Sequence, residues 1–277
     1  MTPDKVHECS SDIWWKKQRL SHSDVILGIL KKGHAISPIF SIPHCTKELF
    51  KIDWLHAVDM GIAQDFLGSL FVRCLRHLPG KNQEEQCASL HRKMIEYYKA
   101  MPEQPQSKLL QLKLSMLKKR GSPYPKLRAK GGEVKSLIPF AEKLAKEVLG
   151  NSAECKAIKL CASSLLECYK QLSKDSFAKE DLLASATKFG LQYAGLHKVS
   201  QERGESLWPM KPKFHMFQEL CFTSEDSPAK YFTYRDESFG GFVSSMCERR
   251  GGAFTPLAVG QSFFDRFAAL FSVPALG

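Results

Sequence analysis

The chain has 277 residues with 40 Lys and Arg against 29 Asp and Glu, so its formal net charge is +11 and its isoelectric point lies near 9.2. Hydrophobic residues make up 43% and charged residues 25% of the sequence, which is typical of a soluble globular protein and excludes a disordered or fibrous one. No apolar run approaches the ~20 residues of a membrane helix, and the N-terminus lacks the apolar stretch of a secretory signal, so we expect a nuclear or cytoplasmic protein without a membrane partner.

The N-terminal part of the chain predicts little regular structure before its first long helix. Residues 35–43 are rich in β-forming side chains but contain two prolines, which favours an edge or irregular strand. A helix is expected to begin at Asp53, which would cap it, because apolar residues then recur at helical spacing as far as Cys74. Pro79 and Gly80 would end this run.

The middle of the chain is predicted to be almost entirely helical. Apolar residues at intervals of three and four indicate helices near residues 84–100, 107–119, 137–149, 152–173 and 177–197. After residue 205 the pattern predicts a helix over 214–220, a strand-like segment over 230–234 and a last helix over 242–250.

The nine cysteines are predicted to be reduced thiols of an intracellular protein. Their number is odd, the chain is not small, and no Cys-x-x-Cys motif occurs, which excludes a zinc ribbon or a thioredoxin motif. Cys155, Cys161 and Cys168 follow the apolar face of one predicted helix. We therefore interpret them as small core residues.

The positive charge is concentrated in one segment. Residues 91–150 contain 14 basic and 5 acidic side chains, whereas the two flanking parts of the chain are nearly balanced. A local patch of this density favours a polyanion, most often nucleic acid, through the release of counterions. A solvated helix face followed by a mobile basic loop is the alternative. The predicted nucleic-acid-binding residues are Lys118, Lys119, Arg120, Lys126, Arg128 and Lys130, together with Lys211 and Lys213 of the stiff basic stretch that precedes residue 214.

Two polar pairs stand among apolar residues and are the candidates for chemistry. Asp53 and His56 are three residues apart, and His215 and Glu219 are four apart, so each pair shares one helix face. Each pair would be able to point at one ion or phosphate. A capping interaction or a salt bridge within the helix is the alternative interpretation of both.

Together the two segments resemble a known family. The stretch Ile52–Gly61 with its Asp53-x-x-His56 motif, continued by Leu67-Gly68-Ser69-Leu70, is similar to the Asp-x-Leu/Met-His segment of eukaryotic DDE transposases of the CACTA (En/Spm) kind. Residues 207–215 resemble the Pro-Lys-x-His helix that follows the helical insertion of such enzymes, and residues 234–241 resemble an acidic-Phe-Gly element of transposase-derived proteins.

The resemblance implies a mainly α fold with an α+β component, in which a partial ribonuclease-H-like core is interrupted by a large all-helical insertion. The corresponding domains are residues 1–83, with the Asp-x-x-His helix, residues 84–205, the basic insertion, and residues 206–277, the return to the core. By the same resemblance Asp53, His56, His215 and Glu219 are the catalytic residues, with Asp53 and Glu219 as ligands of Mg²⁺ or Mn²⁺. Asp236 or Glu237 would close the site in place of Glu219.

The sequence departs from the family at its N-terminal end. Only Asp4, Asp12 and Asp24 precede Asp53, and none lies in a convincing strand, so the first catalytic Asp of the fold is not found. We therefore expect the C-terminal part of a transposase, which binds DNA and is inactive in phosphodiester transfer by itself. The alternatives are a non-enzymatic helical scaffold that binds nucleic acid or an acidic partner, and an unrelated metal-dependent hydrolase. A homo-oligomer remains open.

Overall fold

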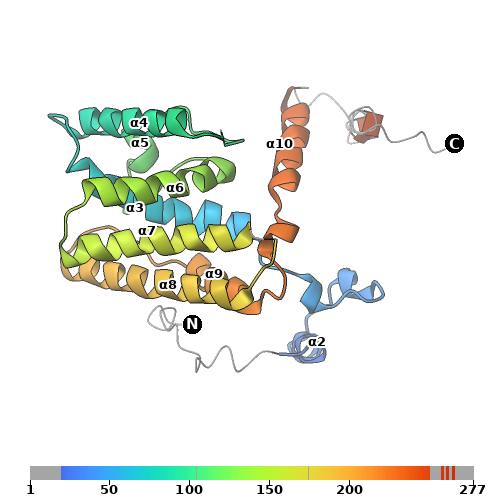
Figure 1. The fold of residues 1–277 in the computed structure, drawn as a ribbon. Helices are drawn as coiled ribbons and strands as arrows, with labels where there is room; N and C mark the ends of the chain where they lie inside the picture. The colour runs from blue at the N-terminus through green and yellow to red at the C-terminus, as the bar shows by residue number, and fades with distance from the viewer. Residues whose placement is uncertain are drawn as a thin grey trace. The chain divides into compact units, whose positions relative to one another are not determined.

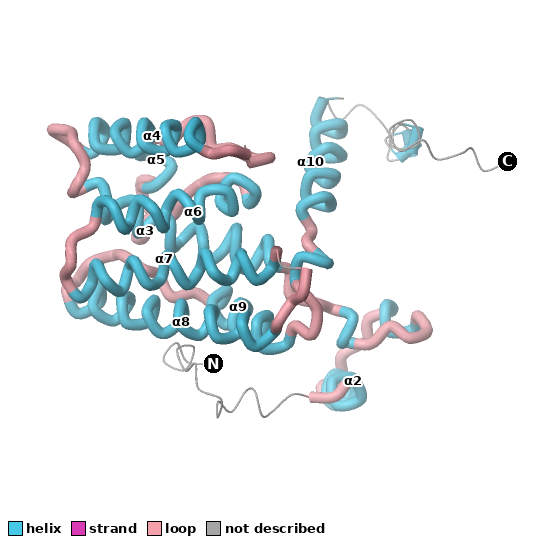
Figure 2. The backbone as a smooth tube through the Cα atoms, viewed as in Figure 1, coloured by secondary structure: helices cyan, strands magenta, loops and turns pink. Residues whose placement is uncertain are grey.

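The computed structural model describes residues 20–103, 105–173 and 175–249, together with 257–258, 260–261 and 264–265. The chain divides into two compact units, Met1–Tyr231 and Phe232–Gly277. All regular elements in the described ranges are helical, and none of these residues lies in a strand (Figure 2). The mainly α prediction is confirmed in this form, and no sheet of a ribonuclease-H-like core is shown.

The first unit consists of helices and the segments between them, with its longer helices side by side (Figure 1). Its α-helices are α2 (His22–Lys31), α3 (Gln64–Leu75), α4 (Gln83–Ala100), α5 (Leu114–Leu117), α6 (Gly131–Val148), α7 (Ala153–Leu172), α8 (Lys179–Glu202) and α9 (Pro212–Thr223). Short 3₁₀ turns are η2 (Pro38–Ser41), η3 (Lys47–Leu49) and η5 (Pro228–Tyr231), and η4 (Leu55–Ala63) is a π-helix. The second unit contains α10 (Tyr234–Arg249).

The core of the first unit is built around α3. Every residue of this helix is buried, and η4 runs directly into it, so the two form one central rod. Helices α6, α4 and α5 pack against α3, while α6 and α9 pack against η4. A helix that is covered on all sides depends on its neighbours for stability, because most helical stability in proteins comes from packing.

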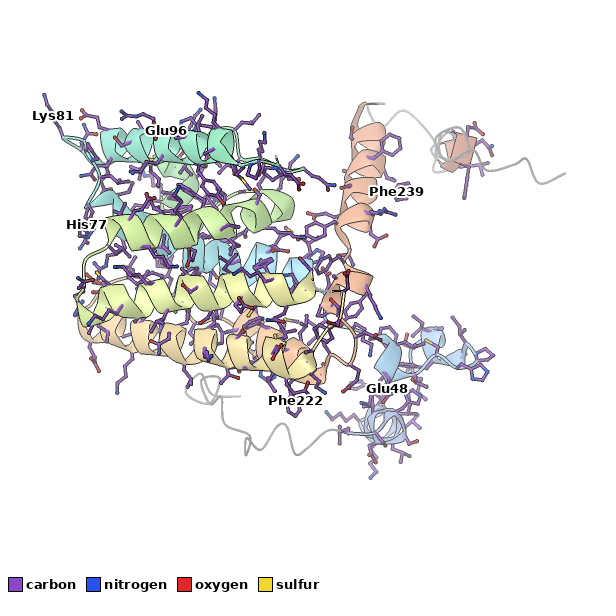
Figure 3. The ribbon with its side chains drawn as sticks, viewed as in Figure 1. Glu48, His77, Lys81, Glu96, Phe222 and Phe239 are labelled. Atoms are coloured by element: carbon purple, nitrogen blue, oxygen red, sulfur yellow. The ribbon has the colours of Figure 1, made fainter. Side chains whose placement is uncertain are left out.

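An aromatic cluster joins α3 to the later helices. Phe66 of α3 contacts Phe189 of α8 with ring centroids 5.6 Å apart, and Trp208 at 5.8 Å. Phe214 and Phe217 of α9 contact the same Phe189 ring at 6.1 and 5.9 Å. Buried aromatic side chains remove large apolar areas from water, so this cluster fixes α8 and α9 onto the central rod. Figure 3 shows the side chains filling the space between these helices.

A buried polar contact fixes η4 to α7. The Tyr169 hydroxyl donates a hydrogen bond to the carboxylate of Asp59, which is 0% exposed. Trp54 packs edge-on against the Tyr169 ring with centroids 5.4 Å apart. The three residues therefore hold the start of the central rod against α7.

Helix periodicity predicted most of these elements but failed for residues 107–119. Only Leu114–Leu117 is helical there, and the preceding residues run as irregular chain along α4. The Leu110 carbonyl lies 3.0 Å from His91 Nε2, and that of Leu112 accepts a weak bond from Cys87 Sγ at 3.9 Å. These carbonyls are turned towards α4, so they do not form a helical ladder of their own.

Both strand predictions were wrong. Residues 38–41 form the 3₁₀ turn η2, and residues 230–234 run from the end of η5 through a two-residue turn to the start of α10. Ile39 and Ile42 are 39% and 58% exposed, so the β-forming side chains of the first segment have no neighbouring strand to pack against. The helix expected over 242–250 is confirmed as far as Arg249, as part of the longer α10.

Further expectations concern thiols and membranes. The cysteines at positions 45, 74, 87, 155, 161, 168 and 221 are free thiols, and Cys161 and Cys168 are buried as core residues while Cys155 is half-buried. In the part of the chain that the structure describes, no helix has the length and apolar character needed to span a bilayer. The described residues of all three predicted domains, up to Tyr231, lie in the first unit.

Candidate nucleic-acid interface

Asp53 and His56 form a pair at the start of the central rod. The Asp53 Oδ2 atom accepts the backbone N–H of His56 at 3.0 Å and lies 2.5 Å from the imidazole Nδ1 atom of the same residue. The His56 side chain is 57% exposed, whereas that of Asp53 is 15% exposed. Asp53 therefore caps the helix, as the sequence predicts, and orients an accessible imidazole.

Lys213, at the start of α9, contacts the helical turn that follows Asp53. Its Nζ atom donates to the carbonyl oxygen of His56 at 2.7 Å and to that of Met60 at 3.3 Å. Within the π-helix η4, Gly61 has a non-helical backbone with φ of −118° and ψ of −108°. A Cβ atom at Gly61 would lie 2.8 Å from Lys213 Cδ, so the glycine leaves room for the lysine stem. The structure thus brings the Asp53–His56 segment and the start of α9 together.

A buried carboxylate lies among three of the predicted nucleic-acid-binding lysines. Asp65 is 4% exposed and accepts a hydrogen bond from Lys211 Nζ at 2.7 Å. Burial raises the pKa of Asp65, while Lys211, Lys126 and Lys213 oppose that rise. Burial lowers the pKa of Lys126; the charge of Asp65 opposes this effect, and the charges of Lys211 and Lys213 add to it. Lysines from two distant segments therefore form one basic cluster around Asp65.

The segment before α9 is fixed at Trp208. Its φ of 52° lies in the left-handed region, which a bulky residue rarely adopts. The Trp208 N–H donates to Ser69 Oγ at 3.0 Å, and its carbonyl lies 2.9 Å from His197 Nδ1. The next carbonyl, of Pro209, accepts a hydrogen bond from the Tyr193 hydroxyl at 3.0 Å. The two lysines that follow therefore extend from a fixed backbone.

Asp53 and Glu219, the carboxylates predicted to bind a metal, each lie beside a histidine that is near in the sequence. His215 Nε2 lies 3.8 Å from Glu219 Oε2, one turn along α9, and Asp53 acts as a helix cap. Asp236 and Glu237 lie in the first turn of α10, in the second unit. Among the residues that the structure describes, no three His, Cys, Asp or Glu side chains gather to hold a metal ion. A divalent cation held by Asp53 and Glu219 therefore stays a prediction.

Part of the predicted basic segment is packed against α3. The backbone N–H groups of Lys126 and Arg128 donate to two carbonyls of α5 at 3.0 and 2.9 Å, and that of Leu127 donates to the Gln64 carbonyl at 2.9 Å. A Cβ atom at Gly68 would lie 2.5 Å from Lys126 Cα, so only glycine allows the two backbones to approach this closely. The Lys126–Arg128 stretch is therefore a packed part of the first unit and does not form a solvated loop.

The remaining predicted cations lie at the two ends of this stretch. Lys130 precedes α6, where its backbone N–H donates to Glu133 Oε2 at 2.8 Å. Lys118, Lys119 and Arg120 are exposed and lead into a tight turn. In that turn the Ser122 N–H donates to the Lys119 carbonyl at 3.0 Å, and the glycine at position 121 has φ of 80°, as a type II turn requires.

A pocket of about 490 Å³ opens beside the turn. Its lining combines cations from two segments, an aromatic ring, two prolines and one carboxylate. The residues that define its chemistry are Arg73, Arg76, Lys118, Lys119, Arg120, Tyr124 and Glu205. Pockets of 300–1,000 Å³ with a few polar groups are typical small-ligand sites, so we call this region the basic pocket.

A network of ion pairs holds one wall of the basic pocket. Arg73 is 8% exposed, and its Nε atom donates to Glu154 Oε1 at 2.9 Å while Nη1 and Nη2 donate to Glu205 at 3.3 and 3.0 Å. Arg203 Nη1 donates to Glu154 Oε2 at 2.7 Å. Burial acts to raise the pKa of Glu154, but the hydrogen bonds and charges of the two arginines outweigh it and lower the pKa. Arg73 is thus neutralised, and the positive charge available to a ligand belongs to Arg76 and the turn.

Sequence reasoning identified the cations of the turn but missed Arg73, Arg76 and Tyr124. The signal for the two arginines was their spacing of three at the end of an otherwise apolar helix. Comparison of the chain with protein-family models, with curated proteins and with solved structures gives no match.

Proposed function

We propose that this protein binds DNA through the basic pocket and the adjoining basic segment, without catalysing phosphodiester transfer. The observation that supports the proposal is the gathering of Arg76 with Lys118, Lys119 and Arg120 around one pocket. The Arg76 side chain is 64% exposed, and the three cations of the turn are exposed as well. Exposed cations that are held by a packed scaffold bind phosphates at a low cost in conformational entropy.

We further propose that the fold derives from the C-terminal part of a DDE transposase of the CACTA kind, including a remnant of its ribonuclease-H-like core. The hydrogen bond of Lys213 to the His56 carbonyl supports this origin, because it joins the two segments on which the resemblance rests. A catalytic step would require carboxylates around a metal pair. Asp53 accepts the His56 N–H as a helix cap and Glu219 lies 3.8 Å from His215 of its own helix, so the proposal gives both carboxylates structural roles.

The experiment is a salt titration of binding to a labelled DNA duplex, followed by fluorescence anisotropy. Log K should fall linearly with log salt concentration, with a slope of about −0.9 per neutralised phosphate. Reversal of Lys118, Lys119 and Arg120 to Glu should remove most of the binding, because it replaces three phosphate contacts by repulsion.

The matched control reverses Lys32, Lys156 and Lys188 to Glu. These lysines are also exposed and lie outside the pocket lining, and their reversal changes the net charge equally. The control should retain nearly the affinity of the unmodified protein. Equal losses in both triple variants, or full binding by the first, would contradict the proposal. Cleavage of the duplex in the presence of Mn²⁺ that is lost in Asp53→Ala would show that the protein is catalytic.

A further inference from the structure

The basic pocket has an aromatic wall that a pure phosphate site would not need. Tyr124 lines the pocket between Pro123 and Pro125, of which Pro125 is buried. Because each proline ring fixes its own φ, the backbone on both sides of the tyrosine is restricted. Ser122 Oγ donates to the Tyr124 carbonyl at 3.0 Å, and Gln201 Nε2 lies 3.4 Å from its hydroxyl. Tyr124 is therefore held both by its backbone carbonyl and by its hydroxyl group.

The charged residues that line the pocket differ in how they are paired. Glu205 accepts hydrogen bonds from Arg73, so this pair contributes polar groups with little net charge. Lys119 and Arg120 are exposed and form no ion pair in the described part of the chain. A ligand that suits the pocket thus has a flat face for the ring and an anionic group for the cations.

We propose that the basic pocket binds one unstacked nucleotide of a single strand, with its base against the Tyr124 ring and its phosphate on Lys119, Arg120 and Arg76. This inference rests on the proposed function and narrows it from DNA in general to single-stranded nucleic acid. In a duplex the faces of the bases are covered by their neighbours, so a duplex presents only phosphates to the pocket. Aromatic rings and a cationic groove are the two components by which proteins bind single strands without sequence preference.

A volume of about 490 Å³ is in the range of pockets that enclose a small organic ligand, which suits a single nucleotide better than a stack of several. Glu205 Oε1 is 4.0 Å from Arg76 Nη1, so the exposed guanidinium of Arg76 lies beside the Arg73–Glu205 pair. A strand is favoured over a free nucleotide because the lining offers four exposed cations, Arg76, Lys118, Lys119 and Arg120, which exceed the charge of one phosphate group. The remaining cations would bind the phosphates of neighbouring nucleotides.

The test compares a labelled oligothymidine with a hairpin duplex of equal length, using the full chain. Tyr124→Ala should weaken binding of the single strand by roughly 5- to 150-fold, the range measured for base–aromatic stacking, and should leave duplex binding unchanged. Tyr124→Phe keeps the ring and loses only the contact to Gln201, so it should bind the single strand within about twofold of the unmodified protein. Thermal unfolding by circular dichroism checks that both variants fold.

Three results separate the hypotheses. If the unmodified protein binds neither nucleic acid, the proposed function fails together with this inference. If duplex binding is intact and salt-dependent but Tyr124→Ala binds oligothymidine as well as the unmodified protein, only the nucleotide pocket is refuted. Arg120→Glu gives a second measure, because it should weaken binding of the single strand and of the duplex alike, and an unchanged affinity for the single strand would overturn the phosphate assignment.

Competition with free thymidine monophosphate distinguishes the source of the nucleotide. Displacement of oligothymidine by a second unlabelled strand but not by the monophosphate would support the proposal of a strand. Tyr124-dependent binding of the monophosphate that is as tight as that of the oligonucleotide would overturn it, and would identify a free nucleotide as the ligand of the pocket.

Discussion

Replacing Gly68 by alanine tests whether the basic segment depends on a close contact with α3. An alanine Cβ would lie 2.5 and 2.6 Å from Lys126 Cα and N and 2.8 Å from Leu127 N, all of them backbone atoms that cannot rotate away. The segment must therefore move. Two hydrogen bonds are at risk, from Leu127 N–H to the Gln64 carbonyl at 2.9 Å and from Gln64 Nε2 to the Ala129 carbonyl at 2.7 Å.

The magnitude follows from opposing effects. Alanine in place of glycine favours a helix by about 1 kcal/mol. Loss of two hydrogen bonds costs about 1 kcal/mol each. Partial exposure of Leu127, which is fully buried, costs about 1 kcal/mol more. We therefore expect Gly68→Ala to lower the free energy of unfolding by about 2 kcal/mol, and to weaken DNA binding because Lys126 moves with the segment.

The assay is urea unfolding followed by circular dichroism, with Gly195→Ala as the control. Gly195 is an exposed residue of α8, and nothing lies within 4 Å of a Cβ atom built there. This control should raise the free energy of unfolding by up to about 1 kcal/mol. If Gly68→Ala stabilises the protein as Gly195→Ala does, the close contact of the two backbones is refuted.

Three further predictions concern buried polar groups. Burial raises the pKa of Asp65 above its usual 3.8, so the folded state binds more protons than the unfolded state and stability falls as the pH rises from 3.8 through the folded pKa. Urea unfolding at several pH values should show that the free energy of unfolding falls less with pH in Asp65→Asn than in the unmodified protein. Identical pH profiles of the two proteins would contradict the raised pKa of Asp65. Arg73→Met removes the buried partner of two glutamates and should lower the free energy of unfolding by about 3 kcal/mol. Arg76→Met should change the free energy of unfolding by less than about 0.5 kcal/mol, because this side chain is exposed. Equal effects of the two substitutions would refute the conclusion that Arg73 is buried and paired while Arg76 is exposed. Tyr169→Phe removes a donor to the buried Asp59 carboxylate and should lower the same free energy by about 1–3 kcal/mol, so an unchanged urea midpoint would show that this hydrogen bond contributes nothing.

Sequence periodicity predicted the long helices because each buries one stripe of apolar residues. It failed where burial does not follow a helical period. In the segment before α5, Leu109 and Leu112 are buried while Leu110 is 71% exposed, and the carbonyls bond to side chains of α4. Such a segment has apolar spacing that imitates a helix over one turn. Propensity alone likewise predicted a strand at residues 35–43, where the described part of the chain contains no second strand to supply hydrogen-bonding partners.

For the candidate interface, the sequence predicted the exposed cations but not the pocket that gathers them. Charge density is local in the sequence, so Lys118, Lys119 and Arg120 were visible as a run. Arg76 and Tyr124 join them only through folding of the chain, and no spacing rule connects their positions. The pairing of Asp53 with His56 was visible as a spacing of three, yet the same spacing fits a cap or a catalytic pair. The hydrogen bond from the His56 N–H to Asp53 shows the cap, and the catalytic role stays a prediction.

The hydrogen bond from Trp208 to Ser69 joins residues that are 139 positions apart in the sequence. A ribosome that adds about 5–20 residues per second makes the second partner roughly 7–28 s after the first. During that interval α3 has been synthesised without α8 and α9, and the apolar surface that these helices later cover is open to water. The newly made chain should therefore bind chaperones or aggregate until α9 has emerged, and folding of the central rod should be one of its last steps.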